Sequence, residues 1–173
     1  MANKITGCVF DLDGTLADTA PDIALALNKS LNDAGYKQLP LESIKRMIGN
    51  GIPVLVRRAL FHVEAPDNLA PDVITSMLSY SRKYYCEKSS LMHGVENCLE
   101  GLKKRAIPMS VCTNKDETVA QMVVSALGLN SYFNTIVGSR PDLVKKPDPS
   151  MLQIAAEAIN SPIETTMMIG DSE

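Results

Sequence analysis

Residues 5–16 read ITGCVFDLDGTL, an apolar run followed at once by two carboxylates and a glycine. The run from Ile5 to Phe10 has the pattern of a buried β-strand. Side chains alternate along a strand, so Asp11 and Asp13 can converge on one ligand only if the chain leaves the strand between them, which Gly14 permits. Close carboxylates repel each other unless a cation or a shared proton lies between them. Taken alone, the stretch fits either an acidic turn or a strand that ends in a metal site, an acid/base pair, or both.

The composition limits the class of protein. A chain of 173 residues can form one α/β domain with an inserted subdomain. A net charge of -3 gives no basic field for nucleic acid, so no nucleic-acid partner is expected. The apolar run Ile5 to Phe10 is too short for a signal peptide or a membrane span. We therefore expect a cytoplasmic protein with no membrane partner.

A helical block follows the first strand. From residue 17 to residue 89 the apolar residues recur at helical spacing, interrupted by Gly35 and by the turn Gly49-Asn50-Gly51. The pattern predicts four short helices that form a small bundle. We expect residues 17–89 to be an α-helical cap subdomain inserted after the first strand.

Strands and helices alternate in the remainder of the chain. Strands are predicted at 107–112, 135–137 and 166–169, separated by helices at 95–105, 118–127 and 150–159. Strands joined by helices at this spacing imply right-handed crossovers and a parallel sheet covered on both faces. The expected fold is an α/β doubly wound parallel sheet, built from residues 1–16 and 90–173, with the helical cap inserted.

Distinctive polar residues stand at the carboxyl ends of these strands, where open parallel sheets bind ligands. They are Asp11, Asp13, Thr113-Asn114-Lys115, Lys145-Lys146 and Gly170-Asp171-Ser172. Singly, each segment fits a helix cap, a solvated loop or a turn. Together they suit a phosphate with a magnesium ion, because Mg²⁺ prefers oxygen ligands such as Asp11 and Asp171.

The same set suggests a reaction. Thr113, the Asn114 amide and Lys146 could hold phosphoryl oxygens. A carboxylate can attack phosphorus, while a second carboxylate protonates the leaving oxygen and later activates water. Asp11 and Asp13 fit these two roles.

Four segments also resemble the motifs of the haloacid dehalogenase superfamily of phosphatases. The segments are VFDLDGTL at 9–16, TNK at 113–115, KPDP at 146–149 and GDS at 170–172, in order and at suitable spacing. The resemblance implies Asp11 as nucleophile, Asp13 as acid/base with its carbonyl on the metal, and Asp171 on Mg²⁺. It likewise implies Thr113 and Lys146 on the phosphate, Lys146 because it directly precedes a proline.

Part of the helical block is similar to one group within this superfamily, the phosphoglycolate phosphatases. The similarity lies in residues 18–22 and 48–60. It implies a mobile cap, and we expect Asn50 and Gly51 to lie on a turn that descends over the substrate.

The expected function is that of a magnesium-dependent phosphomonoesterase acting on a small phosphorylated acid, 2-phosphoglycolate, through an aspartyl phosphate. Two alternatives stay open: a phosphosugar mutase or nucleotidase with the same core, and a non-catalytic binding protein of the same fold. Family members continue beyond the fourth motif with another strand, so we expect residue 173 to precede a missing part of the fold. The strand at 166–169 would then have an unpaired edge through which chains could self-associate.

Overall fold

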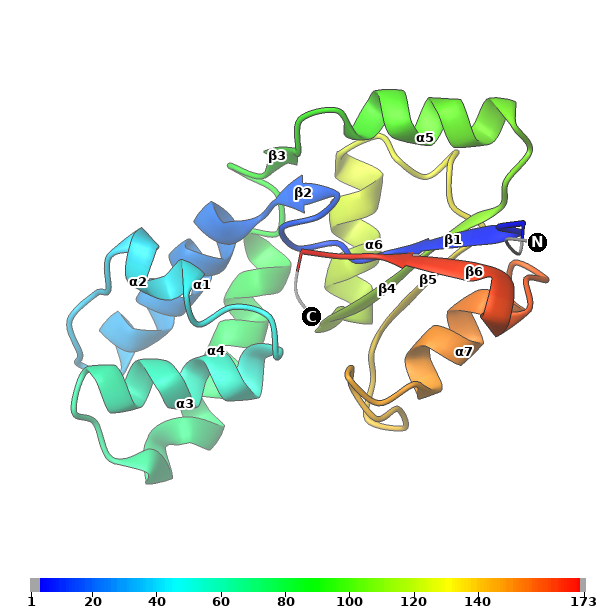
Figure 1. The fold of residues 1–173 in the computed structure, drawn as a ribbon. Helices are drawn as coiled ribbons and strands as arrows, with labels where there is room; N and C mark the ends of the chain where they lie inside the picture. Colours follow the sequence, from blue (N-terminus) through cyan, green and yellow to red (C-terminus); the bar gives the residue numbers. More distant parts are fainter. Residues whose placement is uncertain (1–3, 172–173) are drawn as a thin grey trace. The chain divides into compact units, whose positions relative to one another are not determined.

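The computed structural model describes residues 4–171 of the chain (Figure 1). The fold divides into two compact units. One unit comprises the residues up to Asp18 together with those from Ser90 onward, and the other is Thr19–Ser89. Each unit has its own hydrophobic core.

A four-stranded parallel sheet forms the centre of the first unit. In chain order its strands are β1 (Gly7–Phe10), β4 (Met109–Asp116), β5 (Thr135–Ser139) and β6 (Thr166–Ile169). Their order across the sheet is β5-β4-β1-β6, with every neighbouring pair parallel. The prediction of an α/β fold with a parallel sheet is confirmed. Because the strands are parallel, their carboxyl ends all lie at one edge.

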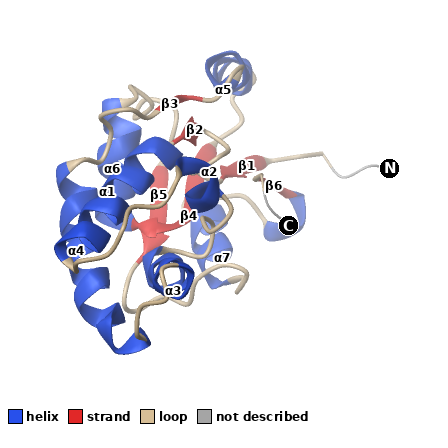
Figure 2. Ribbon diagram, turned by 90° about the vertical axis from the view of Figure 1, so that its left-hand side faces the viewer, coloured by secondary structure: helices blue, strands red, loops and turns tan. Residues whose placement is uncertain are grey.

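Helices cover both faces of this sheet. They are α5 (Val95–Lys104), α6 (Glu117–Ala126) and α7 (Ser150–Glu157), with a short 3-10 turn at Ile163–Thr165. Helix α7 packs on the face that presents Val9, Cys112 and Val137, whereas α6 lies on the opposite side (Figure 2). The alternation of side chains along each strand thus supplies both apolar layers.

Two features of the first unit differ from the sequence expectation. Strand β4 continues to Asp116, four residues beyond the predicted end, because its pairing with β5 resumes at Asp116 after a register shift. A second, two-stranded antiparallel sheet pairs β2 (Ala17–Asp18) with β3 (Ser90–Leu91). Ala17 and Asp18 therefore group with the first unit, although the sequence pattern assigned them to the helical block.

The second unit is helical. It contains α1 (Ala20–Asp33), α2 (Leu41–Lys45), α3 (Ile52–His62), a 3-10 turn (Asp67–Leu69) and α4 (Ala70–Lys83). Aliphatic side chains from all four α-helices form its core, including Leu27, Ile44, Leu60 and Met77. Within the described residues, no helix combines the length and the apolar character needed to cross a bilayer.

Candidate active site at the carboxyl edge of the sheet

The turn after β1 brings the first two carboxylates out of the sheet. The Asp11 backbone N–H still donates to the Ile169 carbonyl of β6, at 2.8 Å. Beyond it the chain turns at Gly14, whose φ of +80° lies in the left-handed region that favours glycine. The Gly14 N–H donates to the Ala17 carbonyl at 2.9 Å and closes the turn. The chain thus leaves the strand between Asp11 and Asp13. This is what the two side chains need if they are to converge on one ligand.

Each of these carboxylates has a lysine partner. The Lys146 ammonium lies 2.8 Å from Asp11 Oδ2, and the Lys115 ammonium lies 2.8 Å from Asp13 Oδ1. The four side chains are between 10% and 19% exposed, so the charges are largely withdrawn from water. Largely buried charges are costly unless they are paired. The two ion pairs therefore allow two carboxylates to be held at the end of one strand.

Thr113 and Asn114 lie at the same edge, on the last part of β4. Thr113 is 1% exposed, and its Oγ1 accepts a hydrogen bond from the Lys115 backbone N–H at 3.3 Å. The Asn114 side chain makes two hydrogen bonds to the backbone of Lys146. Its Nδ2 donates to the Lys146 carbonyl at 3.1 Å, and its Oδ1 accepts from the Lys146 N–H at 2.9 Å. Asn114 thus links β4 directly to the loop that carries Lys146.

Asp171 lies beside the turn after β1. A Cβ atom added to Gly14 would stand 2.4 Å from Asp171 Oδ2, so the absence of a side chain at Gly14 makes room for this carboxylate. Among residues 4–171 no group of three or more acidic, histidine or cysteine side chains is arranged to hold a metal ion. The carboxylates of Asp11 and Asp171 and the Asp13 carbonyl are hard oxygen donors, the type that Mg²⁺ takes together with water and phosphate oxygens, and their joint binding of a metal ion stays a prediction.

Asn50 and Gly51 belong to the helical unit. Asn50 Oδ1 accepts from Arg58 Nη2 at 3.1 Å, and the same guanidinium donates to the Met47 carbonyl at 2.9 Å. Gly51 has a φ of +81° and precedes α3. Arg58 thus fixes the turn from α3, and the role of Asn50 and Gly51 in substrate binding stays a prediction.

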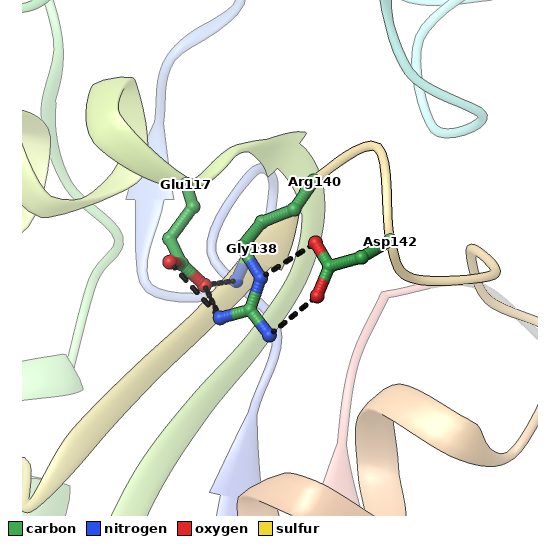
Figure 3. Close-up of polar contacts among 4 residues, drawn as sticks. All are labelled: Glu117, Gly138, Arg140 and Asp142. Carbon is green, nitrogen blue, oxygen red and sulfur yellow. Dashed lines mark hydrogen bonds and ion pairs between the residues drawn. The ribbon is translucent and has the colours of Figure 1, made fainter.

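A second polar network fixes the end of β5, as Figure 3 shows. The Glu117 carboxylate accepts the Gly138 backbone N–H at 3.0 Å and an Arg140 guanidinium N–H at 3.3 Å. The guanidinium also reaches Asp142, with Nε 3.3 Å from Oδ1. Its hydrogen bond to Glu117 is the main cause that raises the pKa of Arg140. The network ties the first residue of α6 to the start of the loop after β5.

Sequence reasoning gave no role to Lys115, Glu117 or Arg140. Lys115 could have been noticed, because it stands two residues after Thr113 in a motif already singled out. Glu117 and Arg140 carried no such signal, since an acid after a strand and an arginine in a loop are common. Glu117 and Arg140 are partners of each other although they are 23 residues apart in sequence, and only the folded sheet brings them together.

Comparisons with known proteins agree on one family. The family described as Haloacid dehalogenase-like hydrolase matches residues 8–173. A phosphoglycolate phosphatase of Colwellia psychrerythraea (strain 34H / ATCC BAA-681) is 35% identical over 170 residues, which cover 95% of this chain and 75% of that protein. A phosphoglycolate phosphatase of Pseudomonas syringae pv. syringae (strain B728a) is 36% identical over 169 residues, covering 95% of this chain and 61% of that protein.

Solved structures with a similar fold include a protein of the same kind. A crystal structure of a predicted phosphoglycolate phosphatase from Haemophilus somnus 129pt superposes with a TM-score of 0.88 at 26% sequence identity. The match covers 99% of this chain and 79% of that one. The similarity therefore extends over both units, while the known proteins are longer than this chain.

Proposed function

Because the chain belongs to the haloacid dehalogenase-like hydrolase family, we propose that it is a magnesium-dependent phosphomonoesterase that hydrolyses 2-phosphoglycolate through an aspartyl phosphate. The observation that carries the proposal is the pair of ion pairs Asp11–Lys146 and Asp13–Lys115 at the carboxyl edge of the sheet. The choice of substrate is supported by relatives that are phosphoglycolate phosphatases.

The proposed reaction has two steps. In the first, an Asp11 carboxylate oxygen attacks the phosphorus, the ester P–O bond breaks, and protonated Asp13 gives its proton to the departing alkoxide. In the second, Asp13 takes a proton from water, which attacks the phosphorus and releases Asp11 and inorganic phosphate. Lys115 beside Asp13 would hold that carboxyl group in place throughout.

Two further groups would bind the phosphoryl oxygens. Lys146 is already 2.8 Å from the attacking carboxylate and would move its ammonium onto the oxygens of the bound phosphate. Thr113 would offer its hydroxyl from the buried end of β4. Asp11, Asp171 and the Asp13 carbonyl would hold Mg²⁺, which neutralises charge on the phosphoryl group when bound.

Release of inorganic phosphate from a panel of esters tests the proposal. The panel contains 2-phosphoglycolate, a hexose phosphate and a nucleoside 5′-monophosphate, each with Mg²⁺ and with excess chelator. We expect the highest kcat/KM for 2-phosphoglycolate, no turnover in chelator, and recovery when Mg²⁺ is restored. A higher kcat/KM for the nucleotide would favour the nucleotidase, and full activity in chelator would exclude the metal.

The covalent step has its own test. Asp11→Asn should abolish turnover, because an amide is nearly isosteric but does not form an acyl phosphate, and it should also lower the thermal midpoint, because Lys146 loses its counter-charge. Asp13→Asn should retain a residual rate about 10² to 10⁴ times lower than that of the unchanged chain. Mass spectrometry after rapid quenching should find the phosphoryl group on Asp11 only where that carboxylate is present. Substantial turnover by Asp11→Asn would contradict the mechanism.

A further inference from the structure

The loop that carries Lys146 must be fixed for its ammonium to stay on Asp11. A lysine side chain has four rotatable bonds, and holding it in one conformation costs up to about 2 kcal/mol of entropy. An exposed, free loop would add the cost of ordering its backbone. The structure shows what orders it, and it gives the Asn114 side chain a role other than the phosphate contact expected from the sequence.

Asn114 holds Lys146 by its backbone. The amide group uses both its donor and its acceptor on one residue, at 3.1 Å to the Lys146 carbonyl and 2.9 Å from the Lys146 N–H. Asn114 is 8% exposed, so water competes little with these bonds. Strand β4 pairs with β1 as far as Val111 and with β5 as far as Cys112 and again at Asp116, so Asn114 lies between paired positions of the strand.

The same loop is anchored separately at its two ends. At its start, Glu117 holds Gly138 and Arg140 (Figure 3). At its end, Asp148 accepts hydrogen bonds from the Ser150 backbone N–H, at 2.9 Å, and from the Ser150 hydroxyl. These bonds lower the pKa of Asp148. Loss of the Asn114 side chain would therefore free the middle of the loop while both ends stay attached.

We propose that Asn114 is a positioning residue that acts on catalysis through Lys146, by clamping the Lys146 backbone to β4. The proposal rests on the proposed function, in which Lys146 binds the phosphoryl oxygens beside Asp11. It gives separate tasks to consecutive residues of β4: Thr113 faces the phosphate, Asn114 fixes Lys146, and Lys115 pairs with Asp13.

A double-mutant cycle on turnover tests whether Asn114 acts on catalysis through Lys146. Asn114→Ala should lower kcat/KM about 10- to 100-fold, the order expected when a catalytic group is misplaced by about 1 Å. Lys146→Ala should lower it further, and adding Asn114→Ala to Lys146→Ala should change nothing more, because the residue through which Asn114 acts is gone. Losses that multiply in the double variant would overturn the proposal.

The chain offers a matched control. Asn28 makes the same two bonds to the backbone of Leu39 in the helical unit, at 2.9 and 2.8 Å. Asn28→Ala should lower the unfolding free energy about as much as Asn114→Ala and leave kcat unchanged. If Asn114→Ala folds poorly, Asn114→Ser also removes the amide that makes both bonds to Lys146 and leaves a small hydroxyl in its place. It should lower kcat/KM in the unchanged background and cause no further loss in the Lys146→Ala background.

A second measurement does not depend on turnover. Acylation of lysines with a limiting reagent, followed by peptide mass mapping, reports how accessible each ammonium is. Lys146, 19% exposed and paired with Asp11, should react slowly in the unchanged chain and several-fold faster in Asn114→Ala, but not in Asn28→Ala. Unchanged Lys146 labelling in Asn114→Ala would refute the clamp. Absence of phosphate release by the unchanged chain, with faster labelling in Asn114→Ala, would instead refute the proposed function alone.

Discussion

Asp11 and Asp13 are tolerated together because lysines from two other parts of the chain lie against them. Lys115 comes from β4 and Lys146 from the loop after β5, and each ammonium is 2.8 Å from its carboxylate. Removing one lysine would leave a largely buried carboxylate without a counter-charge, which costs more than the pair itself contributes. At the residue scale, acidic and basic side chains alternate in the candidate site. The proposed chemistry depends on both ion pairs being present.

Gly14 provides one residue-scale prediction. Gly14→Ala would place a Cβ 2.4 Å from Asp171 Oδ2 and force that carboxylate aside. We expect the Mg²⁺ concentration for half-maximal activity to rise about tenfold or more, the order found when support for a metal ligand is lost.

Gly35→Ala is the control, because Gly35 has nearly the same φ, +83°, and its added Cβ meets no described atom within 4 Å. Both variants should lose about 1 to 2 kcal/mol through the left-handed backbone, but only Gly14→Ala should weaken the metal response. An equal metal response in the two variants would remove Asp171 from the metal site.

Cys112 provides a second prediction, about pH. Burial in the sheet is the main cause that raises the pKa of Cys112 to about 11, with Asp11 also raising it and Lys146 lowering it. At pH 8.5 roughly one Cys112 thiol in three hundred would be ionised, and the thiolate is the reactive form. Iodoacetamide at that pH should label the exposed Cys98 in the folded chain and Cys112 only after unfolding.

The raised pKa of Cys112 also predicts how the stability of the fold changes with pH. The native state keeps the Cys112 proton to higher pH than the unfolded chain, whose thiol has the ordinary pKa of 9.0. The contribution to stability is therefore complete below pH 9 and is lost as pH rises toward 11. Cys112→Ala should show a smaller fall in urea midpoint over that range, and an identical fall would contradict the assignment.

At the scale of elements, most of the first unit was predictable because its apolar periods are clear. The predicted strand at 166–169 is β6, and the helices predicted near 95–105 and 118–127 agree with α5 and α6 within a few residues. The length of β4 was not predictable, because its last residues are polar and their inclusion depends on a register shift against β5. Strands β2 and β3 have two residues each, too few for any period.

The candidate site, too, was predictable from the sequence only in part. Asp11, Asp13, Thr113 and Lys146 were named from their positions after predicted strands, and the structure brings them to one edge. The pairing of Lys115 with Asp13 joins residues 102 apart, and the clamp from Asn114 joins residues 32 apart. Such partners follow from strand order and loop course, neither of which is visible in local sequence.

The contact of α6 with β5 gives an element-scale prediction. Helix α6 begins so close to β5 that a Cβ added to Gly138 would lie 2.3 Å from the Glu117 Cα. Gly138→Ala should therefore push the helix start from the strand and lower the unfolding free energy by about 1 to 3 kcal/mol.

Gly101→Ala, within α5 and with no described atom inside 4 Å of its Cβ, should instead stabilise the chain by about 0.5 to 1 kcal/mol. Urea unfolding with equal m-values measures both changes. A Gly138→Ala chain as stable as Gly101→Ala would show that the close approach is not needed.

At the scale of the whole molecule, the two units have separate cores and different polar chemistry. The groups that would handle the phosphoryl transfer, Asp11, Asp13, Thr113, Lys146 and Asp171, all belong to the first unit. These groups act on the phosphoryl end that all esters share, so they give little basis for choosing among leaving groups. Selection would then depend on residues elsewhere, and the sequence points to Asn50 and Gly51 in the helical unit.

Asn50→Ala tests whether the turn at 49–51 selects the substrate. Asn50 is exposed and loses one hydrogen bond, to Arg58, so stability should change by no more than about 0.5 kcal/mol. We expect the ratio of kcat/KM values for 2-phosphoglycolate, a hexose phosphate and a nucleoside monophosphate to shift, while the rate of aspartyl phosphate hydrolysis stays the same. Asn130→Ala, another exposed asparagine with one side-chain bond, to Ser125 in the first unit, should leave the ratio unchanged. If Asn50→Ala also keeps the ratio, the turn at 49–51 is only a link between α2 and α3, and the choice of substrate lies in other residues.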